Sequence, residues 1–158
     1  MIISGGIGAR KQAFRRISSA SGPPSYSDDL TGGKSYTSDE TAGSEYGPEK
    51  AFDDNLVTRW YATTAARHWI RVDFGDGTPI KIAKLRCYTE HNNYIGDFAF
   101  EGSNDGTSWT NVMSGSAPLG LTWYEFEFTN KVAYRYYRMY QDTNHAGYIN
   151  EIEMMKIV

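Results

Sequence analysis

The chain has 158 residues, of which 40% are hydrophobic and 15% aromatic, so it has material for one domain core and is too short for two of ordinary size. Its net charge of −3 excludes the basic footprint that sequence-independent binding to DNA or RNA requires, so nucleic acid is not an expected partner. The single cysteine, Cys87, excludes an intrachain disulfide.

Residues 1–33 differ in composition from the rest of the chain. They are rich in Gly, Ser and Arg, and residues 1–27 carry a charge of +4 without one acidic residue, which leaves −7 for the remainder. Residues 9–17 have amphipathic spacing, but a helix of that length is marginal without a partner. We therefore interpret residues 1–33 as an irregular N-terminal arm, a candidate anchoring segment, and residues 34–158 as the domain.

After Lys34, strand-length segments alternate with turn signals, a pattern typical of an all-β sandwich or barrel. In residues 69–74, for example, Ile70, Val72 and Phe74 fall on one face of an alternating strand. The turn sequence Asn-Asp-Gly at 104–106 is expected to join two antiparallel strands. Six strands are predicted, over residues 69–74, 80–88, 97–101, 123–128, 134–140 and 150–157.

Four segments of the domain match one family pattern. They are AFDDNLVTRW at 51–60, HWIRVDFG at 68–75, SNDGTSW at 103–109, and RYYRM at 135–139 followed by INEIE at 149–153. Together they resemble the discoidin family, also called coagulation-factor (F5/8) type C domains, and the related family 32 carbohydrate-binding modules. The resemblance implies an eight-stranded antiparallel jelly roll, galactose-binding-like, that binds ligands through loops at one end. The sequence departs from the pattern at Asp54, where the family usually has Gly.

A group of oxygen-bearing side chains lies in the first of these segments. Asp53, Asn55 and Thr58 fall within six residues, a spacing that suits a loop wrapped round Ca²⁺, which takes six to eight oxygen ligands. The resemblance implies that Glu151 adds a carboxylate from the last strand and that a carbonyl near Ala51 completes a structural calcium site. The alternative is that Asp53 and Asn55 form an Asx turn and Thr58 bonds to its own backbone.

Three polar loops form the predicted ligand-binding surface. The first, at residues 88–97, lies where the resembled family carries much of its sugar-binding surface. Sugars need flat aromatic surface and directional hydrogen-bonding groups, and Tyr, His and Asn provide both. The candidate residues are His91, Asn92, Asn93 and Tyr94 in this loop, Tyr61, Arg67 and His68 in a second, and Asn144, His145 and Tyr148 in a third. The alternative for each loop is ordinary solvated turn chemistry, so the loops are a stronger prediction than any one residue.

Catalytic signatures are missing from the sequence. It has no Gly-x-Ser-x-Gly elbow and no phosphate loop, and its three histidines are too scattered for a zinc motif. The expectation is a domain that is not an enzyme. Trp60, Trp69 and Trp109 are expected in the core rather than in a binding site.

These observations predict a calcium-stabilised, non-catalytic carbohydrate-binding module, lectin-like, for a cell-surface glycan. The apolar start, Met1 to Ile3, is too short for a signal peptide, which favours a virion or other extracellular particle, and otherwise the cytoplasm. We expect the arm to join the domain to a larger protein assembly, such as a bacteriophage tail or head appendage, a fibre or spike used in host attachment. The alternative is a structural or protein-interaction module without sugar binding. Membrane binding is disfavoured because the loops are polar, and homo-oligomerisation is left open.

Overall fold

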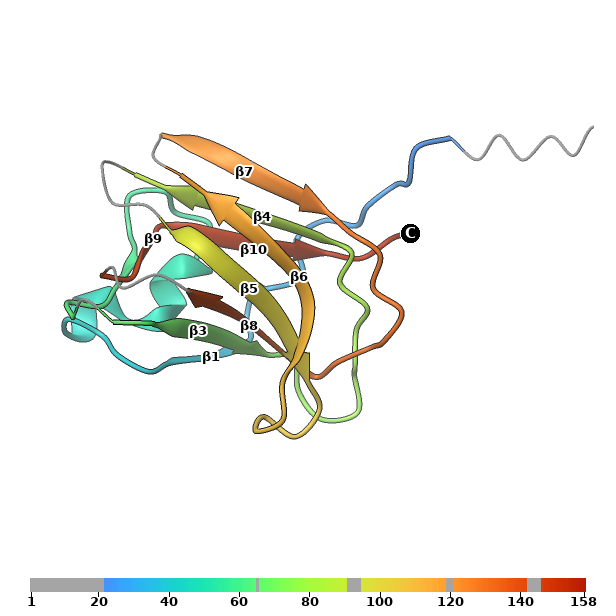
Figure 1. Cartoon of the computed structure of the whole chain (residues 1–158), viewed down its shortest axis with the longest axis horizontal. Coiled ribbons are helices and arrows are strands. Elements are labelled where there is room, and N and C mark those ends of the chain that lie inside the picture. The colour runs from blue at the N-terminus through green and yellow to red at the C-terminus, as the bar shows by residue number, and fades with distance from the viewer. Residues whose placement is uncertain (1–21, 65, 91–94, 119–120, 142–145) are drawn as a thin grey trace, which may run out of the picture.

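Two antiparallel sheets enclose one hydrophobic core in the computed structural model, which describes residues 22–64, 66–90, 95–118, 121–141 and 146–158 (Figure 1). The larger sheet has the strand order β1 (Ser35–Ser38), β3 (Trp69–Asp73), β8 (Tyr136–Gln141), β5 (Gly96–Ser103) and β6 (Thr110–Ala117). The smaller has the order β10 (Glu151–Met155), β4 (Lys84–Thr89) and β7 (Thr122–Glu127). The expected antiparallel sandwich is thus confirmed.

Shorter elements join the two sheets at one end of the sandwich. The strands β2 (Trp60–Tyr61) and β9 (Tyr148–Ile149) pair with each other. Two 3-10 helices, η1 (Ser44–Tyr46) and η2 (Pro48–Ala51), precede β2 in the chain. They lie at the same end of the molecule as β9 (Figure 1).

Alternation of side chains explains the core. Ile70, Val72 and Phe74 are all buried, as the period-two pattern predicts, and the opposite positions of β3 are only half-buried. Each of the six predicted strands has a counterpart. The segment from residue 80 enters its sheet only at Lys84, because Ile80 forms just an isolated bridge to Tyr134. The strands β1, β2, β6 and β9 were not predicted individually.

The three tryptophans do not share one environment. Trp60 is fully buried, as expected. Trp69 and Trp109 are half-buried instead, and for these two the core prediction is wrong. The Arg71 guanidinium lies 5.4 Å from the Trp69 ring centroid, and that of Arg138 lies 4.2 Å from the Trp109 centroid. Both indoles therefore stack against arginines on the outer side of the larger sheet.

The end of the predicted arm runs beside β10. The Leu30 amide donates to the Met154 carbonyl at 3.0 Å, and the Val158 amide donates to the Ser25 carbonyl at 3.0 Å. Asp29 Oδ1 accepts from the Met154 amide at 2.8 Å. Residues 25–31 thus pair with the edge of the smaller sheet. The amphipathic stretch 9–17 lies outside the described residues, and within the described part no helix is long and apolar enough to cross a membrane.

Candidate functional site

The described ends of the three predicted loops lie at the end of the sandwich that holds η1, η2 and β9 (Figure 1). Tyr61 and Tyr148 are partners in the β2–β9 pair, and their ring centroids are 6.0 Å apart. The Gln141 amide donates to the His68 carbonyl at 2.8 Å, and Gln141 Nε2 donates to the Ile95 carbonyl at 3.0 Å. These bonds connect the bases of loops 61–68, 88–97 and 141–148. We call this end of the molecule the rim.

The predicted ligand-binding residues are only partly visible at the rim. Arg67 is exposed and Tyr61 half-buried, whereas Tyr148 and His68 are buried. The other six candidates lie outside the described residues, and their roles stay predictions: His91, Asn92, Asn93, Tyr94, Asn144 and His145.

His68 lies beneath the rim surface rather than on it. Its side chain is only 2% exposed, its Nδ1 lies 3.1 Å from Asp39 Oδ2, and its Nε2 lies 2.9 Å from the Thr64 carbonyl. Asp39 Oδ1 also accepts from the Trp69 amide at 3.0 Å. The imidazole therefore stabilises the loop from inside, and both of its ring nitrogens have polar partners within the protein.

Glu40 fixes the same loop from a distant part of the chain. Its Oε1 accepts from the Thr63 amide at 3.1 Å and from the Thr63 hydroxyl at 2.7 Å, and the Thr64 hydroxyl donates to Oε2. These donors lower the pKa of Glu40 to about 2, so the carboxylate is ionised at neutral pH. The sequence carries no local signal for this contact, because 23 residues separate Glu40 from Thr63.

An arginine between tyrosine rings completes the described part of the rim. The Arg59 guanidinium lies 5.2 Å from the Tyr46 centroid and 5.0 Å from the Tyr148 centroid. Tyr46 also meets Tyr61 edge-on at 5.7 Å. Burial raises the pKa of Tyr148 and nearby Arg59 opposes the shift, so this phenol is neutral at neutral pH. Sequence reasoning missed Arg59 and Tyr46, and the rim gains ordered aromatic surface from them.

A buried carboxylate lies behind the first family-like segment. Glu151 is 1% exposed, its Oε1 accepts from the Ile152 amide at 3.3 Å, and its Oε2 has no hydrogen-bond partner among the described residues. Burial raises the pKa of Glu151 to about 8, and the negative charges of Asp53 and Asp54 add to the shift. A buried polar atom without a partner is costly, so this oxygen is a natural ligand for a cation or a proton.

The loop facing Glu151 collects further oxygens. Thr58 Oγ1 donates to Asp53 Oδ1 at 2.8 Å and lies 2.9 Å from the Asn55 carbonyl oxygen. The Asn55 amide donates to Asp53 Oδ1 at 3.2 Å, which is the Asx turn that the sequence left as the alternative. Asp54 takes the Gly-like backbone with φ 57°, which Asp tolerates better than most residues.

The two arrangements are compatible, because the turn brings oxygen atoms together. No group of three or more His, Cys, Asp or Glu side chains suited to a metal occurs in the described ranges. The candidate set instead combines two carboxylates, Asp53 and Glu151, with the Thr58 hydroxyl and nearby carbonyls. Oxygen ligands of mixed type are those that Ca²⁺ prefers. The residues therefore fit the calcium prediction, and the orphaned Glu151 Oε2 is the feature that supports it.

Comparison with known proteins places this geometry in a family. The model described as F5/8 type C domain matches residues 34–154. Chitosan-binding module 1 from a Paenibacillus sp. IK-5 chitosanase/glucanase is 23% identical, with 82% of this chain and 98% of that chain covered and a TM-score of 0.69. The family 32 carbohydrate-binding module of C. perfringens NanJ, solved with galactose, is 14% identical, with 83% and 99% covered and a TM-score of 0.71.

The same fold also occurs within longer enzyme chains. A Bacteroides thetaiotaomicron protein described as a putative alpha-L-fucosidase is 17% identical, with 82% of this chain but only 28% of that chain covered and a TM-score of 0.69. No curated protein sequence matches the chain significantly. At these identities the structural likeness establishes the fold.

Proposed function

Since the chain belongs to the F5/8 type C domain family, we propose that it is a non-catalytic glycan-binding module whose ligand contacts the rim. The observation that carries this proposal is that the bases of the three polar loops are hydrogen-bonded to one another beside an ordered aromatic cluster. Structural relatives described as carbohydrate-binding modules support it, one of them with galactose and another with GalNAc-beta-1,3-galactose.

The described rim residues suit different parts of a sugar. The Tyr61 ring, held by Tyr46 and Tyr148, offers a face for the C–H side of a pyranose. Arg67 is exposed and offers guanidinium donors to ring hydroxyls. In this proposal the undescribed residues 91–94 and 144–145 complete the contacts.

A glycan array with the purified full chain tests the proposal. Tyr61→Ala and Arg67→Ala should each weaken binding about tenfold, because each removes one contact worth about 1.4 kcal/mol. Lys131→Ala, exposed in the connection between β7 and β8, is the matched control and should bind like the unchanged protein. Single-site affinity is expected to be weak, so the array should display its glycans multivalently. A full array without any bound glycan would contradict the proposal.

We propose in addition that Ca²⁺ is held by Asp53, Asn55, Thr58, Glu151 and the carbonyl region of Ala51. The ion would neutralise the Glu151 carboxylate and connect the loop at 53–58 to β10. The orphaned Glu151 oxygen and the oxygen-rich turn support this assignment.

The basic composition of the N-terminal arm supports a third proposal, that the chain is displayed on a virion or other extracellular particle for attachment to a host glycan. Because residues 25–31 pair with β10, the test should delete only residues 1–21. The shortened chain should lose co-sedimentation with particles from its source and keep glycan binding. Unchanged co-sedimentation would contradict the anchoring role, and a stoichiometric protein partner without any glycan would favour the alternative, a protein-interaction module.

A further inference from the structure

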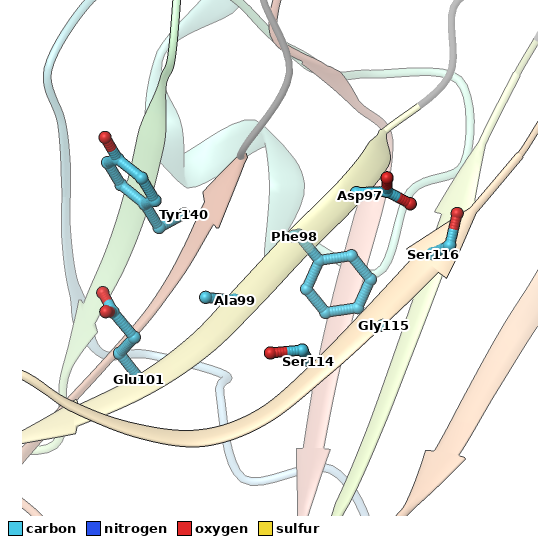
Figure 2. A pocket seen from close by; sticks show the side chains of 8 residues that line it. All are labelled: Asp97, Phe98, Ala99, Glu101, Ser114, Gly115, Ser116 and Tyr140. Carbon is cyan, nitrogen blue, oxygen red and sulfur yellow. The ribbon is translucent and has the colours of Figure 1, made fainter.

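The outer face of the larger sheet carries a groove that the rim does not use. Its volume is about 510 Å³, which is within the usual range for ligand sites. The groove is lined by Asp97, Phe98, Ala99, Glu101, Ser114, Gly115, Ser116 and Tyr140 (Figure 2).

Strand register explains why this face is hollowed. Across β3, β8, β5 and β6, one row of paired positions contains Trp69, Tyr140, Ala99 and Ser114 in that order. The row begins with two large rings and ends with two small side chains, and paired side chains share a sheet face. Ala99 and Ser114 therefore form a shallow floor beside the wall made by Tyr140. Figure 2 shows this floor between Tyr140 and Glu101 on one side and Asp97 and Ser116 on the other.

The wall is held in place by ionic and ring contacts. The Arg138 guanidinium lies 5.2 Å from the Tyr140 centroid and 4.2 Å from the Trp109 centroid. Arg138 is also ion-paired with Glu101 across the β5–β8 register. The aromatic wall is thus ordered before any ligand arrives, which lowers the entropic cost of binding.

The lining determines which ligand class fits. Asp97 and Ser116 are exposed at opposite register positions, and Asp97 takes part in none of the ion pairs of the described residues. Both charged residues that line the groove are acidic, and Arg138 neutralises only Glu101, so an acidic polymer would be repelled by Asp97. A purely apolar ligand would leave the Asp97 and serine oxygens without partners. An aromatic wall, hydroxyls and an exposed carboxylate acceptor together match the C–H faces and hydroxyl groups of a sugar chain.

We propose that this groove is a second saccharide site, which binds an uncharged hexose oligosaccharide along β5 and β6 with one ring against Tyr140. It meets the rim at Asp97, but it uses neither Tyr61 nor Arg67. In this proposal the groove binds a glycan along β5 and β6, and the rim is a separate binding surface.

Amide chemical-shift mapping on the full chain tests this site. Cellohexaose, laminarihexaose and mannohexaose are the uncharged probes, and oligogalacturonate is the acidic one. At least one uncharged probe should shift the amides of Ala99, Ser114 and Ser116 in a saturable manner, and oligogalacturonate should not. No response to any uncharged probe, or a response to oligogalacturonate, would overturn the proposal.

Two pairs of variants locate the response. Ser114→Arg fills the groove from the exposed side of an edge strand and should weaken the groove response tenfold or more. Ser35→Arg, on the opposite edge strand of the same sheet, is the matched control and should leave the response unchanged. Tyr140→Ala should also lose the response, and Tyr140→Phe should keep it. A response unaffected by Ser114→Arg in a protein with unchanged thermal unfolding would refute the site.

The experiments can contradict the rim proposal and the groove proposal independently. Tyr61→Ala should weaken the binding response at the rim about tenfold and leave the shifts of Ala99 and Ser114 unchanged. If the groove responds and the rim does not, the proposed function of the rim is wrong and the groove stands. If only the rim responds, the groove is wrong.

Discussion

Two glutamates lie beside polar loops near the rim, and the described residues supply hydrogen-bond donors to both carboxylate oxygens of Glu40 but to only one of Glu151. Glu40 takes amide and hydroxyl hydrogens from Thr63 and Thr64, and its pKa falls to about 2. Glu151 is more deeply buried, its Oε2 has no hydrogen-bond partner within the described ranges, and its pKa is raised to about 8. Both are glutamates next to a polar loop, so residue type alone does not distinguish them.

The difference in hydrogen bonding between Glu40 and Glu151 shows whether each loop needs a proton or a cation from solution. A carboxylate that is satisfied by protein donors holds its loop without a further component. A buried carboxylate beside Asp53 and Asp54 must instead bind a proton or a cation. The loop at 53–58 is therefore expected to depend on the solution conditions in a way that the loop at 61–64 does not.

The largest expected effect is the increase in the free energy of unfolding when Ca²⁺ binds beside Glu151. Adding Ca²⁺ to chelator-treated protein should raise the free energy of unfolding, by about 2.7 kcal/mol when free Ca²⁺ is about a hundred times its Kd, because the ion binds only the folded state. Glu151→Gln should abolish the increase. Thermal unfolding with and without Ca²⁺ measures both. Equal midpoints for the unchanged protein in the two conditions would remove the calcium assignment.

Glu40→Ala should lower the melting temperature by less than calcium removal does, because the Glu40 side chain is 26% exposed and water replaces part of its bonding. The decrease should be the same with and without Ca²⁺, since the two carboxylates hold different loops. Glu40→Gln keeps one acceptor oxygen and should lie between the alanine variant and the unchanged protein. A loss of the calcium response in Glu40→Ala would show that the two loops are coupled.

Acid should weaken the Glu40 contact in a defined range of pH. The folded-state pKa of Glu40 is lowered from 4.5 to about 2, so its contribution to stability is fully present above pH 4.5 and is lost as pH falls through 2. The melting temperatures of the unchanged protein and of Glu40→Gln should therefore converge across that range in Ca²⁺-saturated buffer. A constant difference between them down to pH 2 would contradict the lowered pKa.

The smallest expected effect on the melting temperature is that of deleting the first part of the arm. Deleting residues 1–21 should leave the melting temperature unchanged, because the shortened chain keeps the hydrogen bonds that join the described segment from Ser25 onward to β10 and the C-terminus. The comparison of Glu40 with Glu151 should then be reproducible in the shortened chain. A lower midpoint after this deletion would mean that the arm also stabilises the domain.

Much of the fold was predictable, because strong alternation marks buried strands. Residues 69–74 show it clearly, and the turn at 104–106 does join β5 to β6, with Gly106 at φ 73°. The strand β6 escaped prediction because its sequence, TNVMSGSA, is mostly small and polar. Those small residues are the ones that leave the outer groove open, so the weakest strand signal coincides with a structural feature of interest.

The candidate site was predictable only as a set of loops. The resemblance to the family predicts that the loops lie at one end of the sandwich. The pairing of Tyr61 with Tyr148 agrees with this for two of them. The burial of His68 depends on Asp39, from which 29 residues separate it, and the position of Arg59 depends on rings from η1 and β9. Such long-range contacts leave no trace in local spacing, so sequence alone does not divide the rim residues into supporting and exposed ones.

The hydrogen bond between Ser25 and Val158 determines which end of the molecule holds both ends of the described chain. It brings the entering and leaving ends of the described chain together, at the end of the sandwich opposite the rim (Figure 1). The chain therefore enters the described domain and leaves it on the side away from the rim. A tag, a fluorophore or a multimerising scaffold fused after Val158 is therefore attached away from the rim.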